Sequence, residues 1–161
     1  MLRALDLGLL RLLRTRGHPP SVEATVVAFA RAGEHGLLWY ALAGIGAALD
    51  RERRPVYLRA ARAVFATMIA NACIKRVVRR TRPVMEGLPA LTPTLSWHSY
   101  PSAHASTSFA GARVLAGALP AGVLYGLAST MALSRPYLGV HYPSDVVAGA
   151  LLGDAMARMT P

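Results

Sequence analysis

The sequence contains very little cysteine and few charged residues for its length. Cys73 is the single cysteine in 161 residues, which excludes an internal disulfide and a cysteine-based metal site. Because Cys73 lies in an apolar run, we expect it to be an inert packing residue. Charged residues make up 16% of the chain, against about 25% in soluble domains. This composition is atypical of an ordinary soluble protein.

Acidic residues are also scarce, with 8 Asp and Glu against 18 Lys and Arg, and the net charge is +10. Lys75 is the single lysine, so the remaining cations are arginines. A disordered basic tail is excluded, because 53% of the residues are hydrophobic. A soluble nucleic-acid-binding module would spread its cations over a polar surface. Here they separate long apolar stretches, which favours a membrane protein.

The N-terminal residues 1–17 lack the features of a secretory signal. Charged residues interrupt the apolar ones, and no small-residue cleavage site follows. We expect a short amphipathic helix on the membrane surface, with Leu9, Leu10 and Leu13 facing lipid. The alternative is that this segment forms the first helix of a bundle.

Prolines and charged clusters divide the rest of the chain into helices. The expected helices cover residues 21–31, 37–49, 56–81, 103–119, 120–135 and 143–159. Segment 84–102 contains several prolines and is predicted to be one long loop, a kind of segment that often carries function. The paired glycines Gly122 and Gly126, and Gly149 and Gly153, have the spacing that lets helix backbones approach closely in lipid.

We therefore predict an all-α, polytopic membrane helix bundle with about five to six short transmembrane helices. The apolar runs have about the length of a membrane span or slightly less. The expected organisation is one membrane-embedded domain over residues 1–161. Residues 1–31 would form the N-terminal interfacial or first helices, and residues 56–158 the catalytic core.

The first polar motif is Lys75, six residues, then Arg82-Pro83. Pro83 is expected to end the preceding helix, because the residue before a proline is disfavoured in the helical region. On a helix, Lys75, Arg79 and Arg82 would share one face. Lys75 and Arg82 are thus expected to point at one anion, with Arg79 as an additional candidate contact.

The second motif is Pro101-Ser102-Ala103-His104, at the start of a predicted helix. Free backbone N–H groups and the helix dipole favour an anion at such a position. The hydroxyl of Ser102 and the amide of Ala103 are candidates to donate to that anion.

The third motif is Ser134-Arg135, five residues, His141, three residues, Asp145. Arg135 has a guanidinium fork that matches phosphate oxygens. In a helical turn, Asp145 would reach one ring nitrogen of His141 and fix its tautomer. All three motifs lie at the ends of apolar helices and are expected on one membrane face.

These residue types together suit phosphoryl transfer. Fixed cations stabilise the charge on the transferred phosphoryl group. A neutral imidazole, here His141, can attack phosphorus and form a phosphohistidine. A second histidine, here His104, can protonate the departing oxygen and later activate water.

Each residue taken singly also has a simpler interpretation. Basic residues at a helix end are usually membrane-flanking anchors, and this is our expectation for Arg76 and Arg80. His104 alone fits a helix cap, and Asp145 alone fits a first-turn acid. Ionisable groups are costly inside a membrane bundle, however, so their clustering at three helix ends favours function.

The three motifs resemble the signature of the type 2 phosphatidic acid phosphatase family, which also includes vanadium haloperoxidases. The family pattern has glycine where this chain has Ala103, and the other motif positions match. The resemblance implies His141 as nucleophile, Asp145 as its orienting carboxylate and His104 as general acid and base. It also implies a phosphate site formed by Lys75, Arg82, Ser102, Arg135 and the backbone amide of Ala103. Alanine is disfavoured there only if the turn needs a positive φ.

The resemblance further implies a metal-independent integral membrane phosphatase that needs no cofactor and acts on a phosphorylated lipid in the bilayer rather than on nucleic acid. Small bacterial members are similar to phosphatases of polyprenyl diphosphates, phosphatidylglycerophosphate or phosphatidate. Size and arginine-rich composition resemble the actinobacterial enzymes that act on decaprenylphosphoryl-phosphoribose, a precursor of cell-wall arabinan, and we favour that substrate.

Two other classes remain as alternatives: a haloperoxidase-like oxidase using vanadate at the same site, and a non-enzymatic membrane or nucleic-acid-binding protein. We expect the bacterial plasma membrane as the location. Arg51, Arg53 and Arg54 lie at the opposite end of the Lys75 helix, so the positive-inside rule favours an extracytoplasmic active site. Trp97, His98 and Tyr100 are candidates for headgroup contacts or for interfacial anchors.

Overall fold

The computed structural model describes residues 2–94 and 96–161, and these residues form helices joined by loops. The elements in chain order are α1 (Leu2–Thr15), α2 (Pro20–Ala32), the short 3₁₀ helix η1 (Glu34–Gly36), α3 (Leu37–Leu49), α4 (Arg54–Val78), α5 (Ala103–Leu115), α6 (Ala121–Tyr137) and α7 (Pro143–Met159). In this part of the chain, β pairing is limited to an isolated bridge between Thr81 and His98. The predicted all-α class is confirmed.

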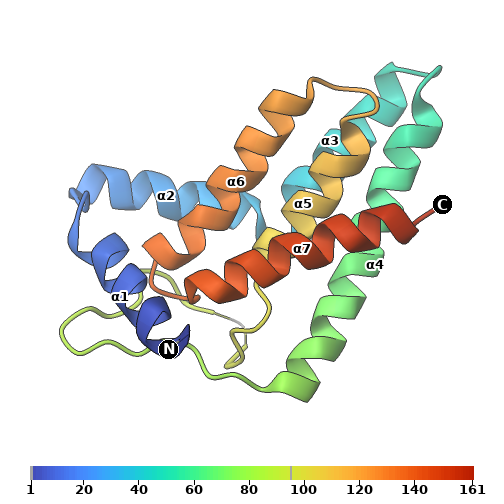
Figure 1. Cartoon of the computed structure of the whole chain (residues 1–161). Coiled ribbons are helices and arrows are strands. Elements are labelled where there is room, and N and C mark those ends of the chain that lie inside the picture. The colour runs from blue at the N-terminus through green and yellow to red at the C-terminus, as the bar shows by residue number, and fades with distance from the viewer. Residues whose placement is uncertain (1, 95) are drawn as a thin grey trace.

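Helix α5 lies at the centre of the bundle and packs against α4, α6 and α7, while α3 packs along α4 (Figure 1). Its sequence suits this position because most of its residues are Ala, Ser, Thr or Gly, which let neighbouring helices pack closely, and α5 is buried around most of its circumference. The buried ring of Trp39 in α3 packs directly on Gly111 of α5, where a Cβ atom would collide with it. Its indole N–H donates to Ser108 Oγ at 2.9 Å. The core is thus formed mainly by α3, α4 and α5.

Two glycines of α7 allow that helix to lie directly on α5. A Cβ atom on Gly149 would lie 2.6 Å from the Ser102 carbonyl oxygen, and one on Gly153 would overlap the Ser106 carbonyl oxygen. Gly122 and Gly126 of α6, by contrast, have no other part of the described chain within 4 Å of such an atom. The predicted close approach is therefore right for α7 and wrong for α6.

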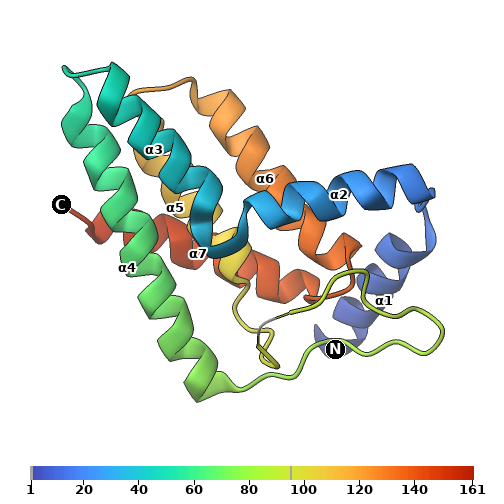
Figure 2. The same cartoon turned by 180° about the vertical axis from the view of Figure 1, so that it is seen from behind.

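Helices α4 and α6 finish, and α5 and α7 begin, on the same side of the bundle, and the last turns of α4 extend beyond the other three ends (Figures 1 and 2). Helix α4 ends at Val78, three residues before its predicted end, because Arg79 adopts a left-handed conformation with φ 49°. The long loop that follows runs past these ends. It is fixed by backbone hydrogen bonds from Ser99 N to Arg80 O at 2.8 Å and from Leu91 N to Leu138 O at 3.0 Å.

Helix α1 packs beside the last turns of α6 and the start of α7 (Figure 2). Leu9 and Leu13 point outward as expected, but Leu10 is fully buried. The inward face of α1 also carries Asp6 and Arg14, both buried. The expected face with three leucines toward lipid is therefore wrong for Leu10, because these two charged side chains have partners inside the protein.

Large apolar side chains are exposed on the outer surface of the bundle. They include Leu37, Ile45, Phe65, Ile69, Val123, Leu133, Val147 and Leu151. Cys73 is also exposed, contrary to its expected packing role. None of the helices in the described part of the chain is both long enough and apolar enough to qualify as a membrane span. The number of transmembrane helices stays a prediction.

Candidate active site

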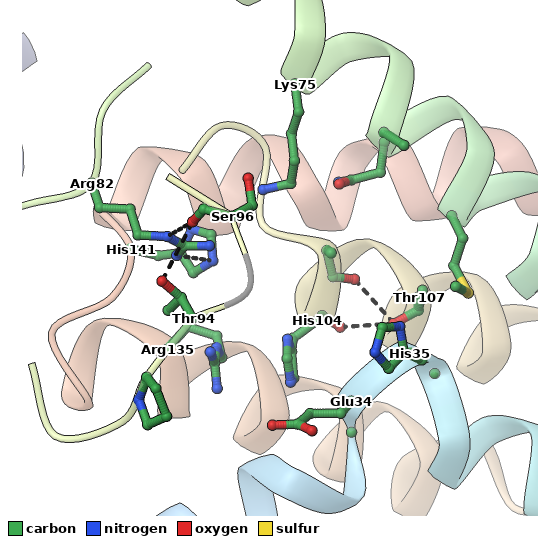
Figure 3. Close-up of a pocket in the computed structure, with 17 residues that line it drawn as sticks. Glu34, His35, Lys75, Arg82, Thr94, Ser96, His104, Thr107, Arg135 and His141 are labelled. Atoms are coloured by element: carbon green, nitrogen blue, oxygen red, sulfur yellow. Dashed lines mark hydrogen bonds between the residues drawn. The ribbon is translucent and has the colours of Figure 1, made fainter. Parts of the chain in front are cut away.

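A cavity of ≈ 250 Å³ lies between the later part of α4, the start of α5 and the end of α6 (Figure 3). Its wall includes residues of all three sequence motifs. The motif residues in the wall are Lys75, Arg82, Ala103, His104, Arg135 and His141. Residues separated by up to 66 positions are thus brought to one place by the antiparallel run of α4 to α7.

His141 lies in the short connection between α6 and α7 and is buried. Its Nε2 atom is 3.1 Å from Nη1 of Arg82. A guanidinium only donates, so Nε2 is the unprotonated ring nitrogen and the proton lies on Nδ1. Burial lowers the pKa of His141 well below its ordinary value, and the charges of Arg82, Arg135 and Lys75 lower it further. The imidazole is therefore neutral, and its Nε2 lone pair accepts from Arg82 at the cavity wall.

Asp145 stands behind His141 in the first turn of α7 and is completely buried. Its Oδ2 atom lies 3.6 Å from His141 Nδ1 and accepts a hydrogen bond from the Tyr142 N–H at 2.9 Å. The 3.6 Å separation is longer than a hydrogen bond, which is common for catalytic groups before substrate binds. The carboxylate is nevertheless placed on the proton-bearing side of the ring.

Three cations surround the same space. Arg82 is fixed by hydrogen bonds to the carbonyls of Ser96 and Val140, both at 2.7 Å, and burial lowers its pKa to about 10, so it remains charged at neutral pH. Lys75 Nζ donates to the carbonyl of His98 at 3.0 Å. Arg135 is buried, and its Nε has no hydrogen-bond partner. Gathering these charges is unfavourable unless an anion binds between them.

His104 occupies the first turn of α5, on the far side of the cavity from His141 (Figure 3). Its Nε2 is 3.1 Å from the carbonyl oxygen of Ala30 in α2. A carbonyl only accepts, so Nε2 carries the proton in this contact and Nδ1 is the nitrogen left for other chemistry. Gly33 lies against the same ring, because a Cβ there would be 3.0 Å from His104 Cδ2. Helix α2 thus positions His104.

Ser102 and Arg79 do not line the cavity. Ser102 is fully buried as the N-cap of α5, and its N–H donates to the Asp145 carbonyl at 3.0 Å. Arg79 is exposed, and its Nε donates to the Arg76 carbonyl at 2.9 Å. The expected shared face of Lys75, Arg79 and Arg82 does not form, because α4 ends before Arg79.

Arg80 is a site residue that sequence reasoning missed, since we expected a membrane anchor. Its guanidinium donates to Asp145 Oδ1 at 2.8 Å and to Asp6 Oδ2 at 2.7 Å, and it lies 4.0 Å over the Tyr142 ring. Asp6 also accepts from the N–H and hydroxyl of Ser144 at 2.9 and 2.6 Å. A chain of ion pairs therefore runs from α1 to the carboxylate beside His141.

The aromatic residues of the long loop do not line the cavity. Trp97 is 90% exposed, which fits the anchor alternative better than a headgroup contact. The loop residues in the wall are instead Pro93, Thr94 and Ser96. The wall also contains Glu34 and His35 of η1, which no sequence motif indicated.

The arrangement can carry out nucleophilic substitution at a bound oxyanion. The three cations can hold a phosphate, the Nε2 lone pair of His141 lies beside them, and His104 lies across the space as a proton donor or acceptor. In the described residues, no three His, Cys, Asp or Glu side chains are grouped as a metal site would require.

Comparison with known proteins agrees with this geometry. The chain is 43% identical over 135 residues to a decaprenylphosphoryl-5-phosphoribose phosphatase of Mycobacterium tuberculosis, an alignment that covers 83% of this chain and 76% of that protein. It is 42% identical over 132 residues to the phosphatase of the same name from Mycolicibacterium smegmatis, covering 81% and 72%.

Two solved structures share the fold. Aquifex aeolicus LpxE superposes with a TM-score of 0.84 and 27% identity, covering 97% of this chain and 94% of that one. A transmembrane phosphatidylglycerolphosphate phosphatase of Bacillus subtilis superposes with a TM-score of 0.78 and 22% identity, covering 99% and 84%. Residues 56–161, more than half of the chain, match the PAP2 superfamily. The motifs, the fold and these relatives agree, and the chain belongs to the PAP2 superfamily.

Proposed function

We propose that this protein is a membrane lipid-phosphate phosphatase that works through a phosphohistidine intermediate. The observation that carries the proposal is the contact of His141 Nε2 with Arg82 Nη1 at 3.1 Å inside a cavity that also holds Lys75 and Arg135. It combines an unprotonated nucleophile with the cations that a transferred phosphoryl group requires.

In the first step, the lone pair of His141 Nε2 forms a bond to phosphorus, and the bond from phosphorus to the leaving oxygen breaks. A proton that Nδ1 of His104 takes up when the anionic substrate binds passes to that oxygen, so the product alcohol leaves neutral, while Nε2 keeps its own proton toward the Ala30 carbonyl. The proton on His141 Nδ1 stays in place and turns toward Asp145, whose negative charge stabilises the cationic phosphohistidine. Lys75, Arg82 and Arg135 hold the phosphoryl oxygens, with the Ala103 amide as a further donor.

In the second step, His104 removes a proton from water, and the resulting hydroxide attacks phosphorus. The bond to His141 Nε2 breaks, inorganic phosphate is released, and His104 is again protonated for the next cycle. Asp145 is aligned for both steps by Arg80 and Tyr142, which occupy its two oxygens. Ser102 contributes through the cap of α5, and Arg79 has no part in this scheme.

We propose decaprenylphosphoryl-5-phosphoribose as the substrate, in the synthesis of a cell-wall arabinan precursor. The support is the name of two relatives that match over four-fifths of this chain. Undecaprenyl diphosphate, phosphatidylglycerophosphate and phosphatidate are the alternatives, and the second of these is the substrate named for the Bacillus subtilis neighbour.

A bilayer location is part of the proposal. Its support is the apolar outer surface of α3, α4, α6 and α7, because contiguous exposed apolar surface is rare on soluble monomers. The basic turn Arg51–Arg54 joins α3 to α4 at the end of α4 remote from the cavity. The positive-inside rule then favours a cavity that opens on the extracytoplasmic side.

The test is phosphate release by the purified protein in lipid nanodiscs across the four candidate substrates. We expect turnover of decaprenylphosphoryl-5-phosphoribose that chelators leave intact, and loss by a factor of about 10⁴ or more in His141→Ala and His104→Ala. Cys73→Ala is the matched control, because Cys73 lies outside the cavity wall. Full turnover by His141→Ala would exclude the phosphohistidine mechanism.

A further inference from the structure

The positions of the two histidines determine where the leaving group must lie. In-line displacement places the leaving oxygen opposite the attacking atom, here opposite His141 Nε2. His104 stands on that side, and the cavity continues past it to η1, where Glu34 and His35 lie beyond His104 as seen from His141 (Figure 3). The part of the substrate that remains on the alcohol therefore enters the end of the cavity lined by η1.

The η1 turn is strained and held in place. His35 has φ 52°, a left-handed conformation that costs a non-glycine residue on the order of 1 kcal/mol. Neighbouring glycines fix the turn from both sides: a Cβ on Gly33 would collide with Met131, and one on Gly36 would lie 2.8 Å from a methyl group of Val64. Both Glu34 and His35, in this turn, line the cavity.

Glu34 is the single acidic residue among the residues that line this cavity. A carboxylate repels a phosphate, so Glu34 cannot itself be a ligand of the phosphoryl group. A carboxylate is, however, a strong acceptor for hydroxyl groups, and an imidazole can donate or accept. An acid and a histidine in the same part of the wall thus suit a ligand with more than one hydroxyl.

We propose that Glu34 and His35 form a subsite for the hydroxyl groups of the leaving group, which selects a sugar headgroup over a diacylglycerol. This inference rests on the proposed function and deepens it. In decaprenylphosphoryl-5-phosphoribose, the ribose hydroxyls are close to the phosphoester that is cleaved. The subsite lies outside the family-matched residues 56–161, so substrate choice and bond cleavage come from different parts of the chain.

The test compares a short-chain analogue of decaprenylphosphoryl-5-phosphoribose with its counterpart lacking both ribose hydroxyls. Phosphatidate and p-nitrophenyl phosphate are measured in parallel. We expect the wild-type kcat/KM to favour the hydroxylated analogue by about tenfold to a hundredfold, because losing a hydrogen bond to a charged group has an effect of that size. Glu34→Ala should reduce this ratio at least about tenfold. The matched control is Glu52→Ala, an exposed acid in the turn before α4, which should keep the wild-type ratio.

A second variant separates strain from binding. His35→Gly removes the imidazole but suits the left-handed backbone, so it should not lower the thermal unfolding midpoint. We expect it to reduce the hydroxyl preference nevertheless. A variant that keeps its stability and loses selectivity cannot be explained by a damaged fold.

Two results would overturn the inference. One is a kcat/KM ratio of the two analogues that stays unchanged in Glu34→Ala and His35→Gly, or an equal loss of kcat/KM on p-nitrophenyl phosphate. If the wild type does cleave the ribose substrate, the proposed function would then survive. The other is a wild type that cleaves phosphatidate in preference to the ribose substrate, which would overturn the proposed substrate as well.

Discussion

The N-terminal third of the chain and the remaining two thirds contribute to the site in different ways. Every side chain with a proposed part in bond making and breaking comes from residues 56–161, which match the PAP2 superfamily. The N-terminal region supplies supports around them: Asp6 holds Arg80, the Ala30 carbonyl holds His104, and η1 closes one end of the cavity. The side chains proposed to react thus belong to the family-matched residues, and their alignment depends on the region before residue 56.

Among changes that test this comparison, the largest loss of turnover is expected from Arg80→Ala, which removes the link between the N-terminal region and the catalytic residues. It leaves the fully buried Asp145 without its charged partner, which misaligns His141, and a misplacement of about 1 Å can lower turnover on the order of a hundredfold. The fall should appear in kcat with KM little changed, because the phosphate ligands stay in place.

Steady-state kinetics in nanodiscs provide the measurement, with Arg76→Ala as the control, an exposed arginine on the preceding turn. Arg80→Lys, which keeps the charge, should recover part of the loss. A rise in KM at constant kcat would instead place Arg80 among the substrate ligands.

The next effect is on stability and concerns the family-matched residues 56–161 alone. Gly153→Ala should lower the free energy of unfolding by about 1–3 kcal/mol, because the new methyl group overlaps the α5 backbone at Ser106. Gly126→Ala is the matched control on the open face of α6, where replacing glycine in a helix should stabilise by up to about 1 kcal/mol. Denaturation in detergent measures both, and equal behaviour of the two variants would contradict the direct packing of α7 on α5.

The smallest effect is expected from Asp6→Asn. The amide keeps a hydrogen bond to Arg80 or Ser144 but removes the charge, so kcat should fall about tenfold while the fold is retained. Activity of this variant at the wild-type level would show that α1 is a passive neighbour of the site. Circular dichroism provides the check on folding, and Glu52→Gln provides the control.

Much of the fold and the family were predictable because the determinants are local. The polar motifs of Lys75, His104 and His141 sit at helix ends that prolines define, so their meeting follows from alternating helix direction. The same reasoning failed at Arg80, whose partners are 65 and 74 positions away in the chain. It also failed at Arg79, because a single left-handed residue ended α4 early and changed the face on which later residues lie.

Glu34 and His35 could not be recognised from the sequence for a similar reason. Their importance depends on where α2 enters the bundle, which is set by packing against α6. A weak signal was present in the neighbouring glycines Gly33 and Gly36, which allow a sharp turn. Asp6 also gave a weak signal in the sequence, because it is an acid in an otherwise apolar and basic segment.

The orientation of α1 links the enzyme to its surroundings. Leu5, Leu9 and Leu12 face outward, while Asp6 faces the site. Contact of the outer side with lipid would favour this orientation, because it removes the leucines from water. Rotation of α1 would withdraw the carboxylate from Arg80. With the proposed bilayer location, the helix that contacts lipid is therefore also the helix that holds a carboxylate on Arg80.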